Sequence, residues 1–226
     1  MAIGLGTRRR RAVSLEEAAG PATPRCPACG EPLFVWIETI GYGATEDQVI
    51  DRCENCGLVL TRGAIPTPDD AAERLLAGAR RWDGRVAFHA ANAASLQTWL
   101  GAENWAALRP GGHGIEPTPR AASLLLARRG LEIRRVRHLA GPGIASMWQT
   151  LLNLLTFHRD FASEAASRRL RPGTGRGRAA FWTDVAVTVL AAIPTAIIAV
   201  FLESVAVLVR RGGVIEVEAD QLPATE

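Results

Sequence analysis

The chain has 226 residues and a formal net charge of +3, from 26 basic and 23 acidic side chains. At roughly 150 residues per domain, this length suffices for one hydrophobic core and a small second unit. Apolar residues make up 48% and charged residues 22%, which excludes a wholly disordered protein, and the small basic excess does not by itself indicate nucleic acid binding. Four cysteines exclude a disulfide-dense secreted scaffold.

The first 22 residues contain a run of four arginines at positions 8–11. A signal peptide would continue with an apolar stretch of about 7–15 residues, whereas Glu16, Glu17 and small residues follow here. We therefore predict a disordered basic leader over residues 1–22. Contact of this leader with anionic lipid or nucleic acid is the alternative.

Two copies of the motif C-x-x-C-G follow, at residues 26–30 and 53–57, with 23 residues between the inner cysteines. Two residues between thiolates let one tight turn direct both sulfurs at a single ion, and the glycine tolerates a positive φ. Two such turns complete the tetrahedral coordination of Zn²⁺ and leave no open position for water or substrate. The spacing therefore predicts a structural zinc site whose ligands are Cys26, Cys29, Cys53 and Cys56.

The residues around these motifs have the pattern of a zinc ribbon over residues 23–63. Short strands are expected at 34–40, 49–52 and 58–60, with a turn at 41–43. So small a unit depends on its metal for folding. Two other uses of the cysteines stay open, namely paired disulfides, which need an oxidising compartment, and a redox or iron–sulfur centre. Acidic side chains around the motifs speak against nucleic acid binding.

A linker rich in proline and aspartate precedes a region of mixed helices and strands. Asp69 or Asp70 is expected to cap the first helix, and Thr118 to cap a later helix that begins with Pro119. The predicted elements are, in order, a helix over 71–81, a turn at 82–84, a strand over 85–89, a short helix over 95–100, a helix from Pro119 to Gly130 and a strand over 131–136.

Several stretches between residues 82 and 136 share their pattern with one known family. They are Asp83-Gly84-Arg85-Val86, Asn92-Ala93-Ala94-Ser95, Glu103-Asn104-Trp105, a loop with His113, and the string from Thr118-Pro119-Arg120 to Arg129-Gly130-Leu131. Together they resemble the C-terminal half of class I S-adenosylmethionine-dependent methyltransferases. Members of one bacterial group of this family carry C-x-x-C knuckles before the methyltransferase core. They end with a long apolar helix, Gly-Gly and a last strand, which here correspond to 185–209, Gly212-Gly213 and 214–217.

The resemblance also implies that the cofactor-binding half is missing. The family holds its cofactor with a Gly-rich turn and an acidic residue on its first strands, and the 28 residues between Cys56 and Arg85 are too few for those units. We therefore expect no S-adenosylmethionine site and no catalytic residue, His113 included. His89, His138 and His158 are expected to be structural. The expected fold is an α/β remnant over 70–140, with a small mixed sheet of strands near 85–90, 131–137 and 214–218, the last one antiparallel.

The C-terminal part is strongly apolar. A helix is predicted over 144–161, so that 141–182 form an amphipathic helix and a basic linker with five arginines between positions 168 and 178. The 18 residues from 185 to 202 carry no charge. We predict a membrane-associated apolar helix over 183–211, with Pro194 inside it, and a last strand and tail over 212–226.

Three arrangements of the apolar helix stay open. Eighteen residues reach about 27 Å, slightly less than a hydrocarbon core of about 30 Å, whereas extension to residue 209 would span it with Glu203 inside. A kinked helix in one leaflet would let residues 214–217 return to the sheet, which a spanning helix would place on the far side. A soluble core helix is the third arrangement. Small residues at 188, 192, 195 and 199, in line with Glu203, suit close helix packing in any of them.

These parts predict a protein on the cytoplasmic side of the cell membrane, either spanning or monotopic, that binds membrane lipid and a structural Zn²⁺. It is expected to act as an adaptor or partner subunit beside a full-length methyltransferase or a glycan-modifying enzyme, without nucleic acid. The alternative is an S-adenosylmethionine-dependent methyltransferase that acts with a complementing chain.

Overall fold

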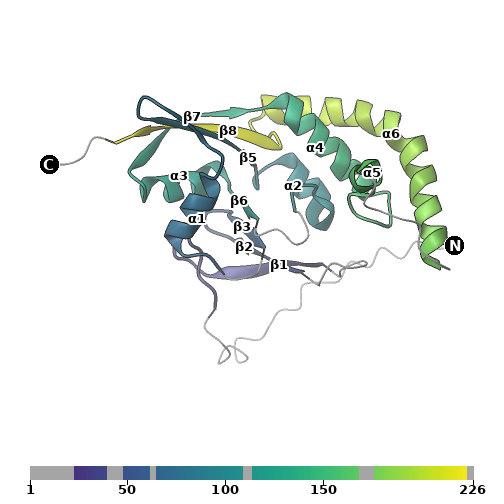
Figure 1. Cartoon of the computed structure of the whole chain (residues 1–226), viewed down its shortest axis with the longest axis horizontal. Coiled ribbons are helices and arrows are strands. Elements are labelled where there is room, and N and C mark those ends of the chain that lie inside the picture. The colour runs from purple at the N-terminus through teal and green to yellow at the C-terminus, as the bar shows by residue number, and fades with distance from the viewer. Residues whose placement is uncertain (1–22, 40–47, 62–64, 109–113, 168–175, 223–226) are drawn as a thin grey trace.

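The computed structural model describes residues 23–39, 48–61, 65–108, 114–167 and 176–222, which form two antiparallel sheets, short helices and one long C-terminal helix (Figure 1). Five features expected from the sequence lie outside these residues. They are the basic leader at 1–22, the turn at 41–43, His113, most of the arginine-rich stretch, at 168–175, and the end of the tail, at 223–226.

The first sheet contains the strands expected for the ribbon. Its order is β1 (Leu33–Thr39), β2 (Gln48–Cys53), β3 (Val59–Thr61) and β6 (Ile115–Glu116), and every neighbouring pair is antiparallel. The first three lie within two residues of their predicted positions. The two-residue β6 comes from much later in the chain and was not predicted, because so short a segment has no detectable periodicity.

The second sheet has the order β4 (Arg80–Trp82), β5 (Arg85–Ala91), β8 (Val214–Gln221) and β7 (Leu131–His138). The three predicted strands are present, and the last strand is antiparallel as expected. The expectation of a mixed sheet is wrong, because β8 lies between β5 and β7. These two strands run in the same direction but do not pair, so every hydrogen-bonded pair is antiparallel.

The first helix, α1 (Pro68–Leu75), is shorter than the predicted helix over 71–81. Gly78, at φ +79°, lies beyond its end, and residues 80–82 instead form β4. The predicted cap is also wrong. Thr67 is the N-cap and accepts a hydrogen bond from the Asp70 amide, while the Asp70 carboxylate accepts one from the Thr67 amide. This reciprocal capping box uses the aspartate at the third helical position.

The next two helices follow their predictions closely. Ser95 caps α2 (Leu96–Gly101), after which a 3₁₀ turn, η2 (Ala102–Asn104), leads into a loop. Thr118 caps α3 (Pro119–Ala127), which starts with proline as expected.

The predicted helix over 144–161 is two helices, α4 (Ala140–Asn153) and α5 (Phe161–Ala166). The break between them is closed by two side chains. Asn153 donates to the Asp160 carboxylate at 3.1 Å and accepts from the Asp160 amide at 2.9 Å, and Asp160 has a φ of +55°. Local apolar periodicity does not reveal such a polar turn.

One hydrophobic core connects the ribbon to the second sheet. Three cysteines, Leu33 and Leu58 from the ribbon share a cluster with residues of α1 and α3 and with Ile215 and Val217 of β8. In Figure 1, α1 and α3 lie between the two sheets. The first sheet packs a second, smaller cluster around the fully buried Trp105.

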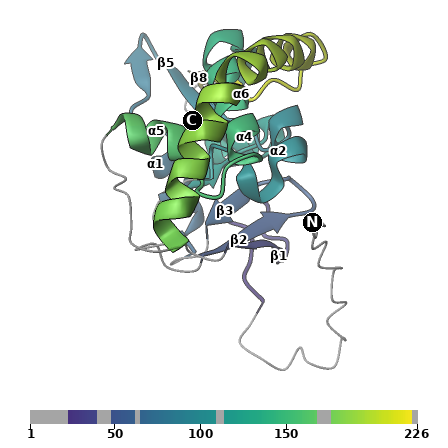
Figure 2. The same cartoon turned by 90° about the vertical axis from the view of Figure 1, so that its right-hand side faces the viewer.

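The long helix α6 (Arg176–Leu208) packs along α4 and bends on its way back to the sheet (Figures 1 and 2). Pro194 lies inside it and lacks the amide hydrogen that a regular helix needs there. The Trp148 indole donates to the Ala192 carbonyl at 3.0 Å and to the Thr195 hydroxyl at 3.1 Å, which ties α4 to this part of α6. By length and composition, Gly177–Leu208 is able to cross a membrane.

Candidate metal centre

Two turns of matching backbone geometry carry the four cysteines. One precedes β1, and the other joins β2 to β3. In each turn the glycine amide donates to the carbonyl of the first cysteine, at 2.8 Å for Gly30 and 2.9 Å for Gly57. The amide of that cysteine in turn donates to the residue after the glycine, at 2.7 and 2.9 Å. The two motifs therefore fold into the same knuckle.

The glycines are required by this geometry, since Gly30 and Gly57 have φ values of +80° and +75°. Gly57 has a second constraint. A Cβ at this position would lie 2.6 Å from the Cγ2 atom of Thr118, which is closer than carbon atoms approach without displacement. The second knuckle therefore leaves no room for a side chain at Gly57.

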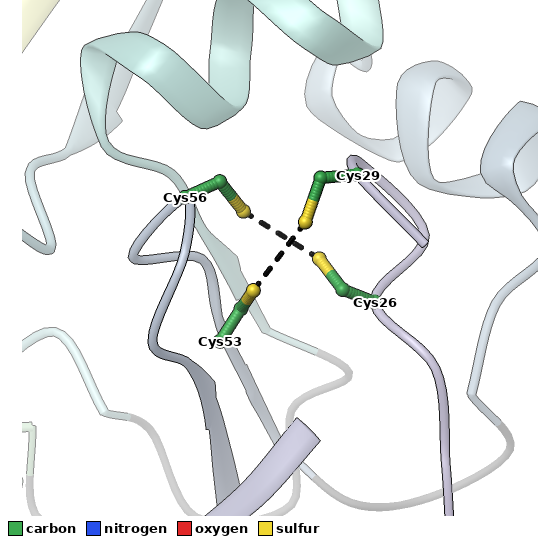
Figure 3. A group of neighbouring side chains, drawn as sticks. All are labelled: Cys26, Cys29, Cys53 and Cys56. Atoms are coloured by element: carbon green, nitrogen blue, oxygen red, sulfur yellow. Dashed lines mark hydrogen bonds between the residues drawn. The ribbon is translucent and has the colours of Figure 1, made fainter. Parts of the chain in front are cut away.

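The four sulfurs converge on one point (Figure 3). The Sγ atoms of Cys26 and Cys56 are 3.5 Å apart, as are those of Cys29 and Cys53, and all four lie within 4.8 Å of one another. A tetrahedral zinc site with Zn–S bonds of about 2.3 Å has sulfurs about 3.8 Å apart. The tetrad thus has the donor set and the dimensions of a structural zinc site.

Burial and hydrogen bonding act in opposite directions on the thiols. The hydrogen bond with Cys56 lowers the pKa of Cys26 to about 5, against the effect of burial. The same hydrogen bond, together with burial, raises the pKa of Cys56, and burial raises that of Cys53. Without a cation the protein therefore favours a mixture of thiol and thiolate. A divalent cation among the sulfurs would allow all four to ionise.

The first turn of α3 supports the second knuckle. The Thr118 hydroxyl donates to the Cys56 carbonyl and accepts from the Ala121 amide at 3.0 Å, while the Arg120 guanidinium donates to the Asn55 side chain at 3.1 Å. The sequence predicted Thr118 as a cap but not its contact with the knuckle. The positive end of the α3 dipole therefore faces a cluster that would be anionic.

All four predicted ligands are brought together, and none is left outside the cluster. All four are free thiols, so no disulfide forms among them. Their number fills a tetrahedral coordination sphere with sulfur, which suits a structural role because it leaves no position for water or substrate. The site is compatible with zinc.

Two buried carboxylates of α6 are polar centres that the sequence did not reveal. Asp184 accepts hydrogen bonds from the amides of Phe157 and His158 at 2.7 and 3.0 Å and contacts His158 Nδ1 at 2.6 Å. His158 was expected to be structural, and no local spacing in the sequence indicated this contact, because Asp184 lies 26 positions away.

The second carboxylate is Glu203, which is completely buried. It accepts from the Gln97 side chain at 2.8 Å and from the Gly213 amide at 2.6 Å. Gln97 also donates to the Gly143 carbonyl at 2.7 Å. The contact therefore joins α2, α4 and α6 to the Gly-Gly turn before β8, where only glycines leave space for it.

Comparisons with protein-family models, curated proteins and solved structures found no match to this chain. Its function is therefore inferred from its own residues.

Proposed function

We propose that the chain is a membrane-associated zinc-ribbon protein that acts as an adaptor or partner subunit on the cytoplasmic side of the cell membrane. The observation that carries this proposal concerns α6, a helix able to cross a membrane by its length and composition. Only 11% of the residues in its most apolar stretch are buried in the protein. A soluble core helix is mostly buried instead. Large exposed apolar surfaces on a folded protein mark sites of interaction with a membrane or a partner.

The cysteine tetrad supports a scaffold role for the other end of the molecule. A closed set of four sulfurs, occupied by Zn²⁺, would hold the ribbon rigid without performing chemistry. Because the cysteines share a core with α1, α3 and β8, the metal would stabilise the second sheet as well. The two parts together suit a protein that presents a surface to a partner.

We further propose that the second sheet is a degenerate, non-catalytic remnant of a class I methyltransferase. The antiparallel β8 supports this relationship, since the family resemblance implied an antiparallel last strand. Acidic residues of β8 form ion pairs with arginines of its neighbours β5 and β7 and of β4, the strand beyond β5. The pairs are Arg80–Glu216, Arg137–Glu216, Arg137–Glu218, Arg85–Asp220 and Arg134–Asp220. This charged face of the sheet suits contact with solvent better than an apolar interface with a complementing cofactor-binding half. The ion pairs therefore favour the adaptor over a methyltransferase completed by a second chain.

The partner is proposed to be a full-length methyltransferase or a glycan-modifying enzyme, with no role for nucleic acid. The test is affinity purification of the tagged full-length chain from detergent-solubilised membranes, followed by identification of stoichiometric partners. We expect the chain in the membrane fraction with bound zinc, in complex with such an enzyme. Recovery in the soluble fraction without a partner would overturn the proposal.

Calorimetric titration with S-adenosylmethionine separates the adaptor from the alternative. We expect no binding to the isolated chain. Binding to the isolated chain, or methyl transfer that only the complex performs, would favour the methyltransferase.

A further inference from the structure

The side chains of α6 are arranged in the reverse of a soluble amphipathic helix. Many of its large apolar side chains point away from the protein, with 48–82% of their surface exposed. We call this set the outer face, and it consists of Leu190, Ile193, Ile197, Val200, Phe201 and Leu208. Asp184, Thr195 and Glu203 are buried against the rest of the protein. The protein supplies hydrogen-bond donors to both carboxylates, whereas water would be an unfavourable environment for the apolar side chains of the outer face. Lipid on the outer face suits this distribution.

The two carboxylates fix α6 to the body of the protein near both of its ends. Asp184, in the first third of the helix, is held by the segment between α4 and α5, and Glu203, near the end, is held by Gln97 and the Gly213 amide. If α6 left the protein to cross a bilayer, both carboxylates would enter an apolar phase without these donors. Such a transfer is costly for an ionised group.

The chain on either side of α6 also argues against a crossing. The strand β8 begins six positions after Leu208 and pairs with β5 and β7 over its length, so the end of the helix stays at the sheet. The helix α4 packs along α6 but has only 14 residues, or about 21 Å, which is too short to cross a core of about 30 Å beside it.

Basic and aromatic side chains mark the two ends of α6. Arg178 and Trp182 are exposed near its start, and Arg210 and Arg211 are exposed just after its end. Arginine is attracted to anionic headgroups, and tryptophan prefers the level of the headgroups, so both ends suit the same membrane surface.

We propose that α6 lies along one leaflet of an anionic membrane, with the outer face in the acyl region and both ends of the helix on the same side. This inference deepens the proposed membrane association and rests on it. The bilayer, rather than a second copy of the chain, is the occupant of the outer face, because arginines at both ends complement anionic lipid and no charge interrupts residues 185–202.

Topology is tested on the full-length chain with a cleavable epitope at each terminus, expressed in cells from which sealed membrane vesicles are prepared. We expect the chain to sediment with the membranes and protease to remove both epitopes from one side only. Protection of one epitope and cleavage of the other would show a spanning helix and overturn the inference while leaving membrane association intact. Failure to sediment with membranes would instead overturn the proposed function.

The lipid contact is tested with vesicles of phosphatidylcholine and phosphatidylglycerol in equal parts. We expect Ile197→Glu and Phe201→Glu each to weaken vesicle binding by about tenfold or more, since each removes a large apolar group from lipid. The matched control is Phe34→Glu, an exposed apolar residue of β1, which should bind as the unmodified chain does. Unchanged vesicle binding of the two α6 variants would overturn the proposal. A dimer that the same variants convert to monomer would also overturn it, by showing that a second copy covers the outer face.

Discussion

The cysteine tetrad and α6 both place ionisable groups inside the protein, but different partners satisfy them. In the tetrad, four thiols from two local turns face one another around a position that a cation would fill. In α6, two carboxylates face backbone and side-chain donors that come from other segments of the chain. The first arrangement depends on an ion and on short-range sequence, and the second depends on long-range packing. This difference determines where each region is vulnerable.

Removal of one thiol should have the largest effect. In Cys53→Ser, a fully buried ligand is lost, and we expect the metal to leave and residues 23–61 to unfold. Zinc binding contributes about 10–16 kcal/mol in small zinc domains, which is as large as the whole free energy of unfolding of a typical domain. Because the tetrad shares a core with α3 and β8, the thermal transition of the whole chain should also fall. Zinc content and circular dichroism measure these effects.

The control for that variant is Glu54→Gln, an exposed position between the two cysteines of the same knuckle. It should keep its zinc and its melting temperature. Retention of a full equivalent of zinc by Cys53→Ser would contradict the assignment of four ligands.

The corresponding change in α6 is Glu203→Ala. It leaves the Gly213 amide and one Gln97 hydrogen without their acceptor, and each buried unpaired donor costs about 1–3 kcal/mol. We expect the free energy of unfolding to fall by roughly 3 kcal/mol in urea titrations. The exposed neighbour offers a control, because Ser204→Ala should stay within about 0.5 kcal/mol. A loss in Glu203→Ala no larger than in this control would mean that the carboxylate does not hold α6 in place.

Two glycines of α4 should respond to substitution with opposite signs. A Cβ on Gly143 would collide with the Glu203 carboxylate, which its hydrogen bonds hold in place, whereas nothing lies within 4 Å of a Cβ on Gly141. We expect Gly143→Ala to destabilise the protein by about 1–3 kcal/mol and Gly141→Ala to stabilise it by up to about 1 kcal/mol. Equal effects in thermal denaturation would contradict the close packing of α4 on Glu203.

The difference between short-range and long-range contacts also explains which parts of the structure could be predicted from the sequence. The tetrad and the strands near it follow from spacing over a few residues, and the strands of the second sheet follow from local alternation. The three-residue β4 was missed because all of its residues are exposed and carry no apolar alternation. The break after α4 depends on Asn153 meeting Asp160, and the position of Glu203 depends on Gln97, which lies 106 positions away. No local pattern encodes such pairs.

The small residues of α6 in line with Glu203 were predictable in part. The sequence identified them as a packing face, and Thr195 and Ala199 are indeed buried. It did not identify what packs there, so spanning, one-leaflet and soluble helices stayed open. The return of β8 between β5 and β7 is a long-range restraint that no local pattern contains, and it favours the proposed one-leaflet arrangement over a spanning helix.

The smallest effect on folding, and the one most specific to membrane binding, should come from the arginines after α6. Arg210 and Arg211 are exposed, so replacing both with glutamine should leave the melting temperature within about a degree of the parent value. Each basic residue near an anionic surface contributes about 1 kcal/mol of attraction, so the double variant should bind vesicles containing phosphatidylglycerol roughly 30-fold more weakly. Binding to pure phosphatidylcholine should not change, because the outer face remains. An equal loss of binding to both kinds of vesicle would mean that the arginines act in folding and not on the headgroups. High salt should weaken the binding of the unmodified chain to phosphatidylglycerol vesicles to the level of the double variant, because salt screens the attraction.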